Sequence, residues 1–161
     1  MNDSEKSTES LRNLTCPVIA IRGRSGSGKT TLINRIVGFL TKKGFQIAVV
    51  KHSGKARPAI DPKGKDTARH LEAGASIVVG SFKEATVFFL GISMALNDIL
   101  RAIGTLGKWD LILIEGYYAK PIPNIALESG DTNELTLANS AEEPFDTILV
   151  KLQEIIQNSL S

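Results

Sequence analysis

The sequence predicts a three-layer α/β fold, in which a mostly parallel central sheet carries helices on both faces. Three observations indicate this fold. Residues 17–21 and 45–50 are short apolar runs rich in β-branched side chains, as is typical of buried strands. Residues 29–43, between these runs, carry apolar side chains at helical spacing. Residues 111–114 are entirely apolar, which suits a strand covered on both faces of its sheet.

The first two strands and the helix between them form one βαβ unit. Pro17 opens the first strand and Gly23 follows it, while Gly44 marks the end of the helix. The apolar face of that helix consists of Leu32, Ile33, Ile36, Val37, Phe39 and Leu40. Because a crossover helix joins strands that run in the same direction, we expect a parallel pair with a right-handed connection.

The middle of the chain departs from this regular pattern. Residues 53–64 hold Gly, Pro, Lys and Arg with little periodicity, which predicts a loop. Residues 65–74 favour a short helix. Residues 75–81 and 85–90 are two further apolar runs, consistent with adjacent strands or a hairpin. The apolar spacing from Met94 to Ile103 then predicts a helix that ends at Gly104.

The remaining elements complete a single domain. After the central strand at 111–114, residues 123–127 and 135–138 are short strand candidates, and residues 145–160 form a closing helix. Residues 1–14 are rich in Ser, Glu, Asn and Lys and are expected to be a disordered tail. The expected organisation is therefore a tail followed by one domain over residues 15–161, a length that supports one hydrophobic core.

Composition excludes several classes of protein. Hydrophobic residues make up 42% and charged residues 22% of the chain, as in ordinary globular proteins. Nineteen Lys and Arg against seventeen Asp and Glu leave a net charge of +2, too small to indicate binding to nucleic acid or to an anionic membrane. No apolar run approaches the roughly 20 residues that span a bilayer. Cys16 is the only cysteine, so no intrachain disulfide forms. We expect a cytoplasmic protein.

A glycine-rich loop lies between the first strand and the first helix. Its sequence from Gly23 to Thr30 fits the pattern G-x-x-x-x-G-K-[ST], the Walker A loop of P-loop NTPases. In such a loop backbone N–H groups and a helix N-terminus bind phosphate oxygens, the lysine reaches the terminal phosphates, and the hydroxyl ligates Mg²⁺. The predicted nucleotide-binding residues are Gly23, Arg24, Ser25, Gly26, Ser27, Gly28, Lys29, Thr30 and Thr31. The alternative is an ordinary Gly-rich turn with a surface lysine.

Glu115 follows the central strand and is the predicted acidic partner of the metal. A Mg²⁺ nucleotide site commonly has a carboxylate at the end of a neighbouring buried strand. Glu115 could instead cap backbone before Gly116. Asp61 and Asp66 compete for the role near the metal, although each could equally be a solvated acid or a helix N-terminal charge.

Lys51 and His52 follow the second strand, so they belong to the same carboxyl edge of the sheet as the loop. His52 alone is more often a polar loop residue than a catalyst, and with His70 as the only other histidine no zinc cluster is available. The basic residues of the next segment form either a solvated loop or a clamp for a second anionic ligand. They are Lys55, Arg57, Lys63, Lys65 and Arg69.

Four segments together resemble the molybdopterin-guanine dinucleotide biosynthesis protein B family, small P-loop proteins of the SIMIBI type. They are the loop at 23–32, Val50-Lys51-His52, the Gly-Lys-Asp-Thr-Ala-Arg-His segment with its Ala-Gly-Ala at 64–75, and Asp-Leu-Ile-Leu-Ile-Glu-Gly at 110–116. The resemblance covers residues 17–128. The loop is common to many NTPases. The 64–75 segment is specific to a much narrower set of proteins, so the resemblance rests mostly on it.

The resemblance implies a GTP-binding homodimer with weak, Mg²⁺-dependent GTPase activity that assists molybdopterin guanine dinucleotide assembly. Its implied partner is the guanylyltransferase of that pathway, and a molybdopterin-type ligand is possible. By matching position, the residues that would bind phosphate and magnesium are Gly26, Gly28, Lys29, Thr30 and Thr31, with Glu115 as the acid near the metal. Lys51, Asp66, Arg69 and His70 would face the nucleotide or a pterin phosphate.

The chain also departs from the family pattern. Residues 53–57 stand where relatives often carry several histidines, and residues 123–126 lack the charges of the family strand. No Asn-Lys-x-Asp guanine-reading motif is present, so guanine preference rests on the resemblance. Asn139-Ser140, after the last predicted strand, is a positional candidate for contact with the base.

Two other functions are compatible with parts of this sequence. A small-molecule kinase that transfers the γ-phosphate of ATP would close the basic segment over its acceptor and use Asp66 or Glu115 to orient the acceptor hydroxyl. Such kinases normally carry arginines in a late lid, and Arg101 is the last arginine here. A metal-insertion chaperone shares the fold type, but one cysteine and two histidines provide few soft ligands.

Overall fold

The structure is a computed structural model that describes residues 16–54, 66–117 and 120–160. The chain divides into two compact units, one made of Met1–Ser53 and Asn97–Ser161 and the other of Gly54–Leu96. The predicted tail and most of the predicted 53–64 loop lie outside the described residues, and the single domain over 15–161 stays a prediction.

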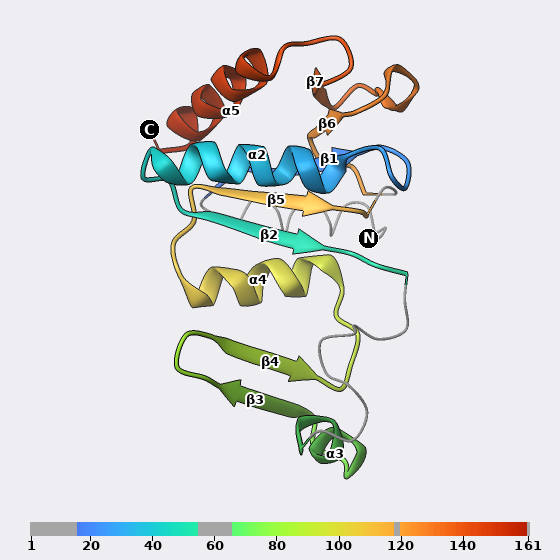
Figure 1. Cartoon of the computed structure of the whole chain (residues 1–161), viewed down its shortest axis with the longest axis vertical. Coiled ribbons are helices and arrows are strands. Elements are labelled where there is room, and N and C mark those ends of the chain that lie inside the picture. Colours follow the sequence, from blue (N-terminus) through green and yellow to red (C-terminus); the bar gives the residue numbers. More distant parts are fainter. Residues whose placement is uncertain (1–15, 55–65, 118–119, 161) are drawn as a thin grey trace, which may run out of the picture. The chain divides into compact units, whose positions relative to one another are not determined.

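The first unit contains a five-stranded sheet in which every strand pair is parallel (Figure 1). The order is β2-β5-β1-β6-β7, so strands distant in sequence become neighbours. The strands are β1 (Val18–Arg22), β2 (Ile47–Lys51), β5 (Leu111–Glu115), β6 (Asn124–Ala126) and β7 (Thr136–Asn139). Because all five run the same way, their carboxyl ends lie along one edge. The predicted parallel α/β sheet is confirmed, with each strand within two residues of its expected start.

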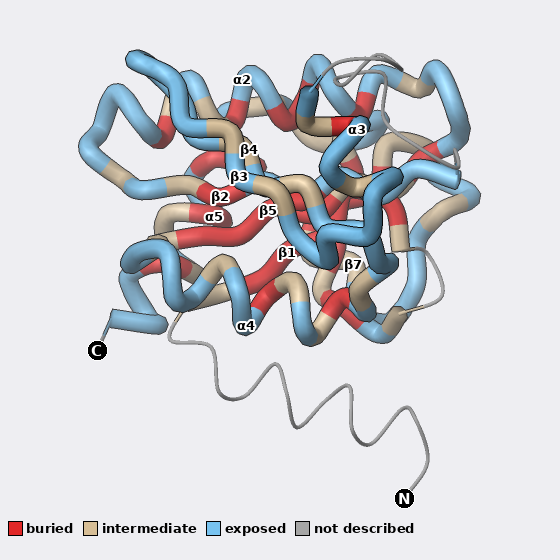
Figure 2. Tube along the Cα trace, turned by 90° about the horizontal axis from the view of Figure 1, so that it is seen from below, coloured by how far each residue is buried: buried red, intermediate tan, exposed pale blue. Residues whose placement is uncertain are grey.

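Helices cover both faces of this sheet. In two perpendicular views α2 (Lys29–Lys42) and α4 (Leu96–Leu106) lie on opposite sides of β5 (Figures 1 and 2). Side chains on β1 alternate between the faces: Ile19 and Ile21 join the main core, while Ala20 is buried on the other face. Figure 2 shows that β1 and β5 are buried along most of their length.

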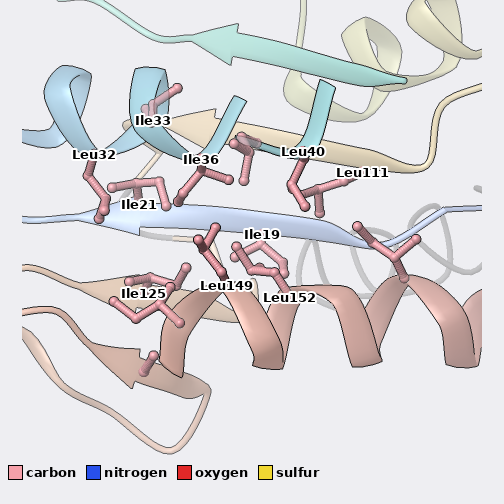
Figure 3. Close-up of a cluster of buried hydrophobic side chains, with 14 residues drawn as sticks. Ile19, Ile21, Leu32, Ile33, Ile36, Leu40, Leu111, Ile125, Leu149 and Leu152 are labelled. Atoms are coloured by element: carbon pink, nitrogen blue, oxygen red, sulfur yellow. The ribbon is translucent and has the colours of Figure 1, made fainter. Parts of the chain in front are cut away.

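The main core lies between the sheet, α2 and α5 (Phe145–Leu160). Side chains from both helices point at β1 (Figure 3). The buried members of the core are Ile19, Ile21, Leu32, Ile33, Ile36, Leu40, Leu111, Leu113, Ile125, Ala138, Ile148, Leu149, Leu152 and Ile156. This packing fixes β1 and the start of α2, which are the two ends of the glycine-rich loop.

The predicted end of α4 at Gly104 is wrong, because the helix continues to Leu106. A glycine inside a helix costs only about 1 kcal/mol relative to alanine, so neighbouring interactions can override it. The indole Nε1–H of Trp109 donates a hydrogen bond to the Ile103 carbonyl at 3.0 Å, which satisfies one of the carbonyls near the helix end. Within the described ranges, no helix combines the length and apolarity needed to span a bilayer.

The second unit contains α3 (Asp66–Glu72) and a two-stranded antiparallel sheet of β3 (Ile77–Ser81) and β4 (Thr86–Leu90). The Phe82 N–H donates to the Ala85 carbonyl at 2.8 Å and closes the turn, so the predicted hairpin is confirmed. One hairpin face pairs Ile77 with Leu90 and Val79 with Phe88. These four side chains are 42–51% exposed.

Candidate functional site

The glycine-rich loop (residues 23–30) joins the carboxyl end of β1 to the first turn of α2. Gly26 and Gly28 have φ values of 81° and 94°, in the left-handed region that favours glycine, as the sequence pattern predicts. The first-turn N–H groups of α2, from Lys29 to Thr31, have no acceptor within the helix because no turn precedes them. The loop and the helix N-terminus therefore present backbone donors to an anion.

Lys29 is buried to 9% exposure, and its ammonium is held by the loop itself. Its Nζ donates hydrogen bonds to the carbonyl oxygens of Gly23, at 2.8 Å, and Arg24. A buried ammonium needs such partners, because burying an unpaired charge is costly. The ammonium therefore lies over the loop, and phosphate oxygens would compete for it with two backbone carbonyls.

Glu115 lies between the loop and Lys51 because β5 pairs with both β1 and β2. Along the sheet, Ile21 and Lys51 are both register partners of Glu115. The Thr30 hydroxyl donates to Glu115 Oε2 at 3.3 Å, and the Lys51 ammonium donates to Oε1 at 2.8 Å. Both carboxylate oxygens therefore have a partner at the carboxyl edge of the sheet.

A cavity of about 350 Å³ opens among these side chains, and we call it the loop cavity. It is lined by Ser25, Gly26, Gly28, Lys29, Thr30, Lys51 and Glu115. Its volume lies at the small end of the roughly 300–1,000 Å³ typical of ligand sites, which suits a phosphate chain better than a whole nucleotide. Two ammonium groups and one carboxylate line it, so it favours an anion.

The donors in the cavity also suit a hard cation. The Thr30 hydroxyl and the Glu115 carboxylate are oxygen ligands of the kind Mg²⁺ prefers, and Mg²⁺ commonly takes few protein ligands and completes its shell with phosphate and water. Among the described residues, no group of three or more His, Cys, Asp or Glu side chains could hold a metal. With Thr30 and Glu115 as protein ligands, a metal at this site would share its coordination shell with phosphate oxygens.

The turn after Glu115 packs against the end of β2. The His52 N–H donates to the Glu115 carbonyl at 2.8 Å, and the His52 ring lies against Tyr117 with centroids 4.4 Å apart. Gly116 has a φ of 102°, and Tyr117, with a φ of 58°, is also left-handed. The turn therefore holds Glu115 and Lys51 in register, while His52 lies at the same edge but not in the lining of the loop cavity.

The other predicted second-ligand residues lie either outside the described residues or in the second unit. Asp61 lies outside the described residues, as do Lys55, Arg57, Lys63 and Lys65. Asp66, Arg69 and His70 lie on α3 in the second unit, where Arg69 Nη1 is 3.9 Å from Asp66 Oδ1. Their proposed role toward a second ligand stays a prediction.

Sequence reasoning missed Glu128, whose Oε2 lies 3.3 Å from Arg24 Nε. The feature that could have indicated Glu128 is its position two residues after β6, at the same edge of the sheet as the loop. Asn139, named only as a positional candidate, is 5% exposed. Its Oδ1 accepts from the Ala141 N–H at 3.0 Å, and its Nδ2 is buried with no partner in the described part of the chain.

Comparison with known proteins places this architecture in a family. The family model of the molybdopterin guanine dinucleotide synthesis protein B matches residues 18–150. The molybdopterin-guanine dinucleotide biosynthesis adapter protein of Haemophilus influenzae is 34% identical over 116 residues, which cover 71% of this chain and 65% of that protein. A relative from Methanocaldococcus jannaschii is 42% identical over 100 residues, 62% of this chain and 40% of the relative.

The fold agrees with a solved structure of the same family. The crystal structure of MobB from Bacillus subtilis superposes with a TM-score of 0.66 at 23% identity, covering 84% of this chain and 97% of that one. This likeness concerns the fold alone. The family match spans most of the chain, from β1 into α5. The chain belongs to the molybdopterin guanine dinucleotide synthesis protein B family.

Proposed function

We propose that this chain is an adapter protein of molybdopterin guanine dinucleotide biosynthesis that binds GTP with Mg²⁺ in the loop cavity. Family membership and the name of the Haemophilus influenzae relative support the pathway. The observation that supports nucleotide binding is that Lys29, Thr30 and Glu115 line one cavity at a helix N-terminus. Backbone donors and a lysine bind phosphate there, and oxygen ligands bind the metal.

Each residue has a distinct role in this proposal. The N–H groups of the glycine-rich loop and of the first turn of α2 bind the β-phosphate, and the Lys29 ammonium binds the terminal phosphates. The Thr30 hydroxyl and the Glu115 carboxylate hold Mg²⁺, which when bound neutralises charge that develops on the phosphate oxygens. Because Glu115 binds the metal in this proposal, its carboxylate is a poor base for activating water. Hydrolysis is accordingly slow.

Calorimetric titration with GTP and with ATP, each with and without Mg²⁺, tests this function. We expect a clear preference for GTP, tighter binding with Mg²⁺, and slow release of phosphate in a parallel assay. Binding of ATP equal to or tighter than that of GTP would favour a small-molecule kinase instead. Failure to bind either triphosphate would contradict the assignment of the cavity.

We propose further that the protein acts as a cytoplasmic homodimer that binds the pathway's guanylyltransferase and possesses affinity for a molybdopterin-type ligand. The exposed hairpin face of Ile77, Val79, Phe88 and Leu90 supports self-association, because such a contiguous apolar face is costly in water. Co-elution of this protein with the guanylyltransferase, with and without GTP, tests the partner.

Light scattering after size exclusion tests the dimer. The Phe88→Lys variant should have the mass of a monomer, since it places a charge in the hairpin face. The Val150→Lys variant is a matched control, because Val150 is 54% exposed on α5, outside the hairpin. A wild-type protein with the mass of a monomer, or a Phe88→Lys variant that remains a dimer, would contradict this interface.

A further inference from the structure

We infer that Lys51 changes partner when a nucleoside triphosphate binds with its metal. In this inference, which rests on the proposed function, the Lys51 ammonium leaves the Glu115 carboxylate and binds the terminal phosphate, while Glu115 turns its oxygens to the metal. Lys51 thereby makes the site selective for triphosphate over diphosphate. No bond other than hydrogen bonds and ion pairs is made or broken.

The first step is competition for one carboxylate. Glu115 Oε1 accepts from Lys51 at 2.8 Å, and Oε2 accepts from Thr30 at 3.3 Å. The Glu115 side chain is only 13% exposed, so it has little room for additional partners. A metal held by Thr30 and Glu115 would therefore compete with the Lys51 ammonium for the same carboxylate.

The second step is that a divalent metal attracts the Glu115 carboxylate more strongly than the Lys51 ammonium does. At equal distance a divalent cation attracts the carboxylate twice as strongly as an ammonium does, and it repels the ammonium. A metal bound there would therefore weaken the pairing of Lys51 with Glu115. In the unliganded arrangement, the Lys51 ammonium binds one carboxylate oxygen of Glu115 while the other oxygen accepts from Thr30.

The third step is the freedom of Lys51 to move. Its side chain is 58% exposed on a flexible four-carbon stem, and within the described part of the chain Glu115 is the recorded partner of its ammonium. Lys29 differs, because it is buried and donates to two loop carbonyls. Lys29 is thus fixed on the loop, whereas Lys51 can swing within the cavity that both line.

The order of the strands gives the direction of the swing. The loop follows β1, Glu115 ends β5 and Lys51 ends β2, and these strands are consecutive in the sheet. A phosphate chain that starts at the loop and shares a metal with Thr30 and Glu115 brings its terminal group toward Lys51. A diphosphate ends nearer the loop, so it places no phosphate oxygen close to Lys51, and the ammonium remains on Glu115.

Calorimetry on two variants tests the exchange. The probes are GDP and a non-hydrolysable GTP analogue, each titrated over a series of Mg²⁺ concentrations. In Lys51→Met, which keeps the length of the stem, we expect the affinity for the GTP analogue relative to GDP to fall about tenfold, the loss expected for one charge-assisted hydrogen bond. The Mg²⁺ concentration needed for half-maximal GDP binding should fall too, because the competing ammonium is gone. Lys43→Met, which removes a lysine at the far end of α2, should match the wild type.

A second measurement needs no variant. The acetylation rate of Lys51 by acetic anhydride, followed by mass spectrometry with Lys43 as the internal reference, should fall with the GTP analogue and Mg²⁺ relative to GDP and Mg²⁺. If the wild type binds both nucleotides, but Lys51→Met weakens them equally and Lys51 is labelled equally in both complexes, the exchange is wrong. If the wild type binds neither nucleotide, the proposed function itself fails.

Discussion

A Cβ atom on Gly116 would lie 2.8 Å from the Cβ of His52, a separation that real Cβ atoms do not adopt. Gly116 also has a φ of 102°, where side chains other than glycine are strained. We expect Gly116→Ala to lower the free energy of unfolding by about 1–3 kcal/mol, as measured by urea denaturation, and to weaken Mg²⁺-dependent GTP binding by displacing Glu115. Gly38→Ala is the control, because Gly38 lies in α2 with open space around its Cα and should be neutral or stabilising.

Replacing Lys29 by alanine should weaken binding of GTP about 10- to 100-fold, and binding of GMP much less. In the proposed function the ammonium binds the terminal phosphates, and such a bond is worth about 1.5–3 kcal/mol. Calorimetry with GTP and GMP gives the two ratios. An equal loss for both nucleotides would show that Lys29 acts only by holding the carbonyls of Gly23 and Arg24.

The Glu115→Gln variant should bind nucleotide nearly as the wild type does when no metal is present, because the amide keeps the shape of the side chain. Its binding should depend much less on Mg²⁺, since a neutral amide is a weaker ligand for a divalent ion. Titrating Mg²⁺ at fixed GTP measures this. A Mg²⁺ titration identical to that of the wild type would remove Glu115 from the metal site.

The main core predicts that truncating a buried side chain of α5 strongly lowers the stability of the fold. Leu152 is 1% exposed in the cluster between α5 and β1, so Leu152→Ala should lower the free energy of unfolding by about 2–5 kcal/mol. Val150, two residues earlier, is 54% exposed. The Val150→Ala variant should change the free energy of unfolding by less than about 0.5 kcal/mol. Similar losses in both variants would mean that α5 does not pack as described.

The environment of Glu143 predicts that the stability of the fold depends on pH. A hydrogen bond from Lys151, and then one from the Asn139 N–H, holds the pKa of Glu143 below its ordinary 4.5. A lowered folded-state pKa stabilises the fold above the unfolded pKa, and the contribution is lost as pH falls through the folded value. Between pH 6 and pH 3, as followed by chemical denaturation, Glu143→Gln should therefore lose less stability than the wild type. Glu142→Gln, its exposed neighbour, should keep the wild-type slope.

The strands and helices of the first unit followed closely from the sequence because their apolar periodicity is local. The prediction for α5 matched its observed bounds, and β1 was displaced by one residue. The end of α4 was missed because the side chain of Trp109, three residues after the helix, satisfies a carbonyl near that end. Local propensity cannot report such a contact.

The arrangement of the candidate site was predicted only in part. Parallel strands place Lys51, Glu115 and the loop on one edge, which sequence reasoning anticipated. That Glu115 separates the other two depends on the order β2-β5-β1, which no local pattern encodes. The Arg24 and Glu128 pair was missed for the same reason, since its members are joined through the β1 and β6 pairing.

That strand order also governs when the glycine-rich loop can acquire its shape during synthesis. Both neighbours of β1 come much later in the chain, β5 at Leu111–Glu115 and β6 at Asn124–Ala126. At about 5–20 residues per second, a ribosome needs several more seconds after making the loop before either strand can pair with β1. The nascent chain therefore carries the loop sequence long before the sheet can hold the loop in place, and any ligand of the loop cavity binds only after that.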